Sequence, residues 1–347
     1  MFCIKILHIL QYIRYTEKYR ENSRNGEHHN MSFASDTKNE LAHIEPEKKC
    51  CMLAEIAGFI RVAGSIGLAG FGKFKIKITT ENPAVARHYK KLIQDYFGIE
   101  TTLEIGEGHG VGKSRSSKFS YSINIDHENL SEQILRECGI LLIKEGNNYI
   151  SDGIYAGIIR TKCCKKAYLR GVFLASGTMS DPEKSYDLEF VLDSPTMAND
   201  LKKMINSFVD LSCKVVQRGK KHVVYMKKAD YISDTLAIMG ASNQVFSLEE
   251  TRIKKEMVNS AKRMSNCDSA NMDRSIEASM KQVEAIKKID EIKGLDSLND
   301  KLREVALLRL EHPDMSIAAL GELCDPPLKK SGINNRLRRI EELAAKL

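Results

Sequence analysis

Two stretches of this sequence are versions of one pattern: residues 50–66, CCMLAEIAGFIRVAGSI, and residues 163–179, CCKKAYLRGVFLASGTM. When Cys50 is placed over Cys163, the cysteine pairs coincide, as do apolar positions and two glycines in each stretch. The coinciding glycines are Gly58 and Gly171, followed by Gly64 and Gly177. This period is too long for a solenoid array, so the pattern indicates a duplicated subdomain.

A second block supports the duplication and predicts secondary structure. KIKITTENPAVARHYKKLI lies over DLEFVLDSPTMANDLKKMI when Pro83 is placed over Pro195. Asn82-Pro83 and Ser194-Pro195 each supply a cap followed by proline, which predicts a helix start. These helices are expected to end near Gly98 and Leu211. Strands are expected at the alternating residues Phe74, Ile76 and Ile78, then at 101–106, 118–125 and 213–228, with an extra helix of the first copy at 128–139.

Composition limits the classes of function. The 347 residues include 53 basic and 46 acidic ones, for a net charge of +7, with 42% hydrophobic residues. This balance is typical of globular domains and excludes wholesale disorder. No stretch reaches the ~18 uncharged apolar residues of a membrane span. The charge permits a polyanionic partner without requiring one.

The nine cysteines are an odd number and follow no secretory signal, which favours reduced thiols in the cytoplasm. Two vicinal pairs, Cys50-Cys51 and Cys163-Cys164, lack the CxxC spacing common in zinc sites. We interpret them as small buried thiols at the start of two related helices. The sequence therefore predicts no metal site and no cofactor.

The C-terminal third is predicted to be helical. Ser247 and Glu250 form a capping box that starts a helix over residues 247–265. A polar break at 266–269 precedes a second helix that ends at Gly294. Apolar residues recur at helical spacing in this second helix and predict a packing face. They are Ile276, Met280, Val283 and Ile286.

Three shorter helices finish the chain in the layout of a helix-turn-helix. The first spans about residues 297–312, Ser316 caps the second, and Ser331 caps the last. Residues 329–339 hold five basic side chains and no acid, which suits phosphate contact and base readout. The predicted DNA-contacting residues are Ser316, Lys329, Lys330, Ser331, Asn334, Asn335, Arg336, Arg338 and Arg339. Further phosphate contacts are predicted at Lys162, Lys165, Lys166, Arg218, Lys220 and Lys221.

The repeated helices resemble LAGLIDADG motifs at residues 56–64, IAGFIRVAG, and 169–177, LRGVFLASG. The resemblance implies two helix backbones in close contact at a pseudo-dyad, with paired β-sheets that form a saddle over DNA. Nucleases of that family hold a divalent metal with an acid before the last glycine of each motif. Here Ala63 and Ser176 occupy those positions, which predicts a scaffold without nuclease chemistry.

The other motif acid is replaced by Arg61 in one copy and Leu174 in the other. Arg61 would add positive charge at the helix end, which suits a phosphate and repels a divalent cation. Asp181 or Glu183 could substitute for a missing acid on one side only. No residue is therefore assigned a catalytic role.

The duplicated domain followed by helices and a terminal helix-turn-helix resembles the WhiA family of bacterial regulators over about residues 31–347. MSFASDTKNELAHI, AYLRGVFLASG, RMSNCDSANMDRS and LGELCDPPLKKSGINNRLRRI carry the resemblance. Asn335 departs from it, since the family implies histidine there. The resemblance implies a cytoplasmic, nucleoid-associated regulator of transcription linked to cell division and sporulation.

We therefore predict an α+β protein with a pseudo-symmetric duplicated domain followed by an all-α domain. The expected segments are an N-terminal extension at 1–30, the duplicated domain at 31–232 with copies at about 47–150 and 160–230, connecting helices at 233–295, and the helix-turn-helix domain at 296–347. Duplex DNA is the expected partner, with RNA polymerase or another regulator as a further one. An active homing-type endonuclease and a protein-interaction scaffold are the alternatives.

Overall fold

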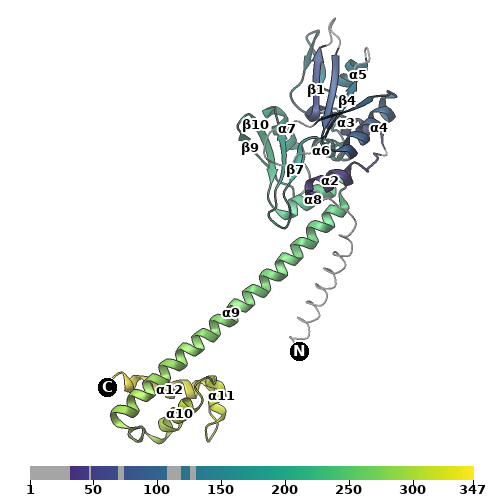
Figure 1. Ribbon diagram of the computed structural model, residues 1–347. Helices are drawn as coiled ribbons and strands as arrows, with labels where there is room; N and C mark the ends of the chain where they lie inside the picture. Colours follow the sequence, from purple (N-terminus) through teal and green to yellow (C-terminus); the bar gives the residue numbers. More distant parts are fainter. Residues whose placement is uncertain (1–31, 47, 69–73, 108–118, 126–129) are drawn as a thin grey trace, which may run out of the picture. The chain divides into compact units, whose positions relative to one another are not determined.

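The computed structural model of the chain divides into two compact units, Met1–Arg252 and Ile253–Leu347 (Figure 1). The described residues are 32–46, 48–68, 74–107, 119–125 and 130–347. The predicted N-terminal extension at 1–30 lies outside them. Each unit is described below by itself.

The first unit contains the repeat as two copies of one order of elements: helix, two strands, helix, two strands, helix. The first copy comprises α3 (Lys49–Ala63), β1 (Gly64–Leu68), β2 (Phe74–Thr80), α4 (Pro83–Phe97), β3 (Thr102–Glu107), β4 (Phe119–Ile125) and α5 (Leu130–Glu137). The second comprises α6 (Lys162–Ser176), β7 (Gly177–Met179), β8 (Leu188–Leu192), α7 (Pro195–Ile205), β9 (Lys214–Arg218), β10 (Lys221–Met226) and α8 (Ala229–Met239). Since α8 follows the last strand just as α5 does, α5 is the counterpart of α8 and not an extra helix.

Each copy forms one antiparallel sheet, and the two sheets have the same strand order. It is β1-β2-β4-β3 in the first copy and β7-β8-β10-β9 in the second. In β2, Ile76 and Ile78 are buried while Lys75 and Lys77 are exposed, which confirms the predicted strand with one apolar face. α2 (Phe33–Leu41) precedes the first copy, and the hairpin of β5 (Leu141–Lys144) and β6 (Asn147–Ile150) lies between the copies in sequence.

The two proline-led helices begin where the sequence predicts. The Asn82 side chain accepts hydrogen bonds from the N–H groups of Ala84 (2.8 Å) and Val85 (3.2 Å). Ser194 caps α7 in the same way. α4 ends at Gly98 as expected, but α7 ends at Ile205, before the predicted Leu211. The chain turns early there, with the Asn206 side chain accepting from the N–H of Cys213 at 2.9 Å.

α3 and α6 lie side by side with their backbones in contact, because two glycines leave room (Figure 1). A Cβ at Gly58 would lie 2.5 Å from the carbonyl oxygen of Tyr168, and a Cβ at Gly171 would lie 2.2 Å from that of Glu55. The superposition of Cys50 on Cys163 relates these two contacts to each other. The close approach implied by the sequence is therefore present, and it is reciprocal.

A buried charge network joins the same two helices, but it occurs only once and has no counterpart related by the repeat. Glu55 is fully buried and accepts from Arg170 Nε at 2.9 Å, while its other oxygen lies 2.8 Å from His88 Nε2. Arg170 also donates to the carbonyl oxygen of Met239, at the end of α8 (3.0 Å). In the superposed repeat, Glu55 corresponds to Tyr168 and Arg170 to Ala57. The backbone contact is symmetric, whereas the ion pair is not.

The first unit extends further along the chain than residue 232. α8, which we expected among connecting helices, places Ile232, Leu236 and Met239 in the core, each at 0% exposure. Each of these residues lies on one face of the helix, so their burial follows from the amphipathic pattern. The unit continues to Arg252, inside the next helix.

α9 (Ser242–Lys293) is one helix where we predicted two. It starts at Ser242 because the carboxylate of Glu40 accepts from the N–H groups of Asn243 (2.8 Å) and Gln244 (3.1 Å), which replaces the predicted Ser247 capping box. The polar residues at 266–269 include neither glycine nor proline, so nothing interrupts the helix there. None of the described helices combines the length and apolarity needed to cross a membrane.

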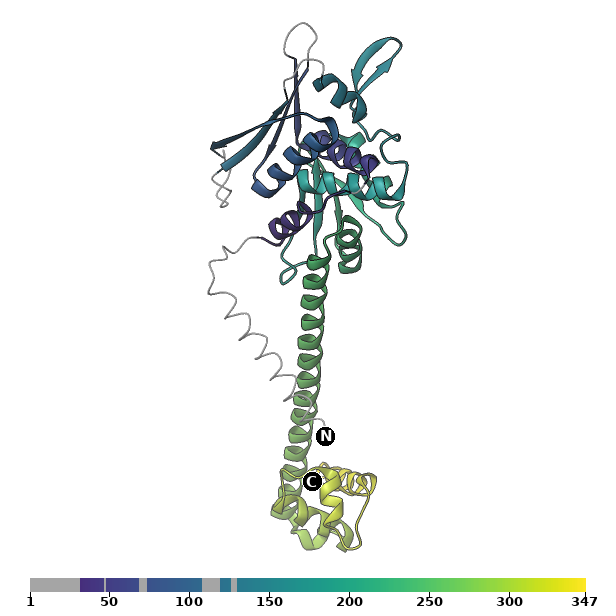
Figure 2. The same ribbon diagram turned by 90° about the vertical axis from the view of Figure 1, so that its right-hand side faces the viewer.

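In the second unit, the C-terminal end of α9 packs against the first and last of the three helices that follow it (Figure 2). The three helices are α10 (Asp300–Glu311), α11 (Ile317–Glu322) and α12 (Lys330–Ala344), preceded by the single turn η1 (Leu295–Ser297). Ile286 of α9 packs with Leu302 and Ile340. The predicted packing face of α9 is confirmed there but is wrong for Ile276 and Met280, which are exposed.

Candidate nucleic-acid interface

The turn between α11 and α12 is closed by close backbone contact. The Ser316 hydroxyl accepts from the N–H of Ala319 at 3.2 Å, which confirms the predicted cap of α11. The N–H of Leu328 donates to the carbonyl of Gly321 at 2.8 Å, and a Cβ at Gly321 would lie 2.2 Å from the Leu328 oxygen. This contact brings the start of α12 against α11.

The start of α12 is open to an anion. Lys329 is the N-cap residue, and no side chain caps the helix there. Ser331 lies inside the first turn, so the prediction that it caps α12 is wrong. Helix N–H groups without a partner carry partial positive charge, to which the exposed Lys329 and Lys330 add full charges.

Most residues predicted to contact DNA are exposed on one side of this helix pair. The exposed ones are Ser316, Lys329, Lys330, Ser331, Asn334, Asn335, Arg338 and Arg339. The opposite side of α12 carries Ile333, Leu337 and Ile340, all buried. We call Lys329, Lys330, Ser331, Asn334 and Asn335 the α12 surface.

Arg336 does not face solvent as predicted. Its side chain is 21% exposed, and Nη1 donates to Glu304 at 3.1 Å and to the carbonyl of Lys301 at 3.2 Å, both on α10. The other oxygen of Glu304 accepts from the N–H of Asp325 in the turn at 2.9 Å. Arg336 and Glu304 thus hold α12 and the turn against α10. The sequence offered one signal that Arg336 is partly buried: it directly precedes Leu337, which faces the core.

Arg338 and Arg339 are partly neutralised within α12. Arg339 donates to Glu342 at 2.9 Å, and Arg338 Nε lies 3.7 Å from the same carboxylate. The unpartnered positive charge is therefore concentrated at the start of the helix, within the α12 surface.

The outer faces of the two sheets differ in charge. On the first sheet, Lys75 and Lys77 alternate with buried isoleucines, and Lys77 lies opposite Asn124 in the register. Neither lysine has an ion-pair partner in the described parts of the chain. We predicted no role for these two lysines from the sequence, although their alternation with Ile76 and Ile78 is visible in it.

On the second sheet, three ion pairs cover the corresponding face. Arg218 donates to both oxygens of Glu189 at 2.8 and 2.7 Å, Lys227 lies 3.4 Å from Asp187, and Lys221 pairs with Asp193. Arg218 and Lys221, predicted as phosphate contacts, are thus already paired with acids, and Lys220 is exposed at the turn between them.

The other predicted phosphate contacts lie elsewhere. Lys162, Lys165 and Lys166 are on the first turns of α6, whereas the sheet begins at Gly177 after the last turn. A helix of 15 residues is about 22 Å long. The lysines at the start of α6 and the basic residues of the second sheet therefore do not form one continuous phosphate-binding surface. Lys165 also donates to the Ser207 hydroxyl at 2.8 Å.

The helix ends that would hold a nuclease metal carry Ala63 and Ser176, directly before β1 and β7. The Ser176 hydroxyl donates to the carbonyl of Val172 at 3.5 Å. Asp181 and Glu183 are exposed in the turn after β7, where Asp181 accepts from the N–H of Glu183 at 2.9 Å. The Asp181 carboxylate therefore serves the turn.

Arg61 is not available to a phosphate, contrary to our expectation. Its guanidinium donates to the Ser151 hydroxyl (2.8 Å) and carbonyl and to the Gly139 carbonyl (3.1 Å). Burial lowers its pKa from the usual arginine value. The side chain ties α3 to the segments on either side of the β5–β6 hairpin.

Comparison with known proteins identifies these parts. Residues 49–141 match the WhiA N-terminal LAGLIDADG-like domain, 165–258 the WhiA LAGLIDADG-like domain, and 261–344 the WhiA C-terminal HTH domain. The chain is 45% identical to the probable cell division protein WhiA of Thermoanaerobacter pseudethanolicus, and 42% identical to that of Alkaliphilus metalliredigens. These alignments cover 91% and 90% of this chain and 98% of each relative.

The crystal structure of full-length WhiA from Thermatoga maritima has a similar fold. It superposes with a TM-score of 0.55 at 23% identity and covers 91% of this chain and 99% of that one. The chain belongs to the WhiA family, and it consists of two LAGLIDADG-like domains followed by a helix-turn-helix domain.

Proposed function

We propose that this protein is a sequence-specific DNA-binding regulator of transcription without nuclease activity, associated with the nucleoid and acting in cell division. The α12 surface is the observation that carries the proposal. It combines two exposed lysines at an uncapped helix start with three polar side chains, Ser331, Asn334 and Asn335.

The roles of these residues follow from their chemistry. Lys329, Lys330 and the free N–H groups of α12 bind phosphates and set the position of the helix on the duplex. Asn334 and Asn335 have amide groups that can pair with adenine in the major groove. Arg336 and Glu304 keep α12 oriented from behind, so Arg336 is a positioning residue in this proposal.

The link to cell division is supported by the names of the relatives, and sporulation is a further expectation from the family resemblance. Genome-wide mapping of bound DNA in the native host tests the regulatory role. Enrichment upstream of division genes is expected. A binding profile equal to that of an untagged control strain would contradict it.

The binding test uses duplex DNA and fluorescence anisotropy over a series of salt concentrations. The double variant Lys329→Ala/Lys330→Ala should bind all sequences more weakly and lower the salt slope by about 2 units. Lys293→Ala, an exposed lysine on α9 of the same unit, is the matched control and should leave binding unchanged. Equal affinities and slopes for the double variant and the wild type would remove the α12 surface from the interface.

The absence of cleavage is tested with supercoiled plasmid. DNA binding should need no divalent cation, and the plasmid should stay intact with Mg²⁺ or Mn²⁺, because Ala63 and Ser176 offer no carboxylate to a metal. Metal-dependent nicking that disappears in Asp181→Ala or Glu183→Ala would support the endonuclease alternative instead.

A further inference from the structure

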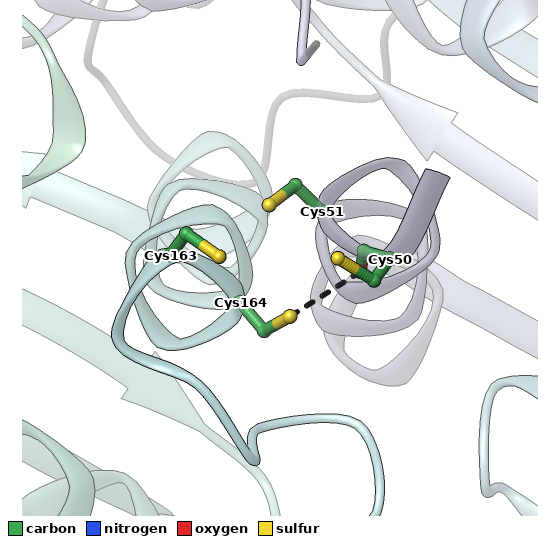
Figure 3. A group of neighbouring side chains, drawn as sticks. All are labelled: Cys50, Cys51, Cys163 and Cys164. Atoms are coloured by element: carbon green, nitrogen blue, oxygen red, sulfur yellow. Dashed lines mark hydrogen bonds between the residues drawn. The ribbon is translucent and has the colours of Figure 1, made fainter. Parts of the chain in front are cut away.

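Four cysteine thiols meet at the N-terminal ends of α3 and α6. Cys50 and Cys51 belong to the first turn of α3, and Cys163 and Cys164 to the first turn of α6. Their four sulfur atoms all lie within 4.8 Å of one another. Figure 3 shows the four side chains directed into the space between the two helices.

We propose that this four-cysteine cluster binds one thiophilic metal ion, with Zn²⁺ as the main candidate, between the two copies of the repeat. Four thiolates around zinc at about 2.3 Å form a tetrahedron with sulfur atoms about 3.8 Å apart. The observed sulfurs would therefore approach each other by about 1 Å or less to reach that geometry.

The donor set selects the kind of metal. Sulfur ligands prefer zinc and other soft ions, whereas magnesium and calcium need oxygen ligands. Cys51 and Cys164 are buried, which limits access of water, while Cys50 is exposed and leaves a path for the ion to enter.

The first turns of the two helices favour the negative charge that thiolates bring, although burial raises the pKa of Cys51 and Cys164. Both helices direct the positive ends of their dipoles at the cluster, and no side chain caps α3. Thr161 Oγ1 lies 3.1 Å from the sulfur of Cys163, and this contact lowers the pKa of that thiol to about 7. The lysines beside the two cysteine pairs are Lys48, Lys49, Lys162, Lys165 and Lys166. Each lies within two residues of a cysteine and adds positive charge to the region, where four thiolates and one Zn²⁺ would carry a net charge of −2.

The position of the cluster gives the ion a structural role. It lies at the opposite ends of α3 and α6 from Ala63 and Ser176, and so is separate from the degenerate nuclease position. An ion held by two cysteines from each helix would tie the first copy to the second. The proposal therefore does not depend on the proposed DNA binding.

The test uses full-length protein, stripped of metal with a chelator and kept reduced. One equivalent of Zn²⁺ should bind, as measured by competition with a chromophoric chelator, and Co²⁺ should give the strong visible absorption of tetrahedral thiolate coordination. Zn²⁺ should also raise the melting temperature, because it binds only the folded arrangement.

Variants assign the ligands. Cys163→Ser and Cys50→Ser should each bind Zn²⁺ at least about tenfold more weakly, since even the loss of an outer contact of a metal site has that effect. Cys267→Ser, an exposed cysteine on α9, is the control and should bind like the wild type. Equal Zn²⁺ affinity in wild type and Cys163→Ser would overturn the proposal. Reduced wild-type protein that binds no Zn²⁺ would overturn the proposal too. This holds even where the same cysteines form disulfides on air oxidation.

Discussion

The two copies of the repeat have kept the same backbone and have acquired different side-chain chemistry. Gly58 and Gly171 make equivalent contacts across the helix pair, and both sheets have the same strand order. In contrast, Glu55 and Arg170 have no charged counterparts in the superposed repeat. Backbone packing constrains both copies equally, because each helix must leave room for the other. A buried polar group only needs one partner, so a single ion pair between the two helices is enough.

Removing one charge of the buried pair is the strongest way to test this difference. Glu55→Ala should reduce the free energy of unfolding by about 3–5 kcal/mol, because Arg170 would stay buried without its partner. Urea denaturation of the full chain measures the loss. The double variant Glu55→Met/Arg170→Met should recover most of it, and a loss below about 1 kcal/mol for Glu55→Ala would show that the pair behaves like an exposed one.

The symmetric glycine contact should respond equally in both copies. Gly58→Ala and Gly171→Ala each place a Cβ against a backbone oxygen, and each should lower stability by about 1–3 kcal/mol. Gly67→Ala in β1, where a Cβ would meet nothing within 4 Å, is the control. A large effect in one copy with none in the other would refute the reciprocal contact.

The outer faces of the sheets should differ in their response to charge removal. Lys75→Gln/Lys77→Gln should lower the salt slope of DNA binding by up to about 2 units if this face contacts phosphates. Arg218→Gln/Lys221→Gln should change it less, since Glu189 and Asp193 already neutralise these residues. Equal slopes for both double variants would remove the contrast between the faces.

The smallest expected effect concerns thiol reactivity in metal-free protein. Cys163 should react with iodoacetamide at neutral pH and lose reactivity as the pH falls below about 7, because protonation removes its thiolate. Cys51, whose pKa is raised by burial and neighbouring thiols, should stay unreactive there. Peptide mass spectrometry after brief labelling compares them, and equal labelling of both would contradict the assignment.

The parts of the fold that depend on local signals could be predicted from the sequence. Asn82-Pro83 and Ser194-Pro195 start helices because cap and proline act within one turn. The alternation around Ile76 predicted its strand for the same reason. The Ser247 cap failed because Glu40, which is distant in the sequence, caps the helix at an earlier position.

The candidate sites depended more on distant contacts. The exposed residues of α12 followed from helical spacing, but the pairing of Arg336 with Glu304 joins two different helices. The ion pairs of Arg218 and Lys221 likewise need the strand register. The two cysteine pairs belong to different copies of the repeat and form one cluster only because the helices are parallel and in register.

The buried ion pair of Glu55 and Arg170, which occurs only once, also determines which copies of the repeat can associate as separate halves. Two first copies would bury a pair of glutamates with no guanidinium between them, and two second copies would bury a pair of arginines. Both arrangements lose the carboxylate–guanidinium pair: each Glu55 keeps only its contact with His88, and each Arg170 only its bond to the Met239 carbonyl. Self-association of either half is therefore penalised. Produced as separate polypeptides, the halves should recognise each other and reject their own kind, which makes the duplication an obligate heterodimer joined in one chain.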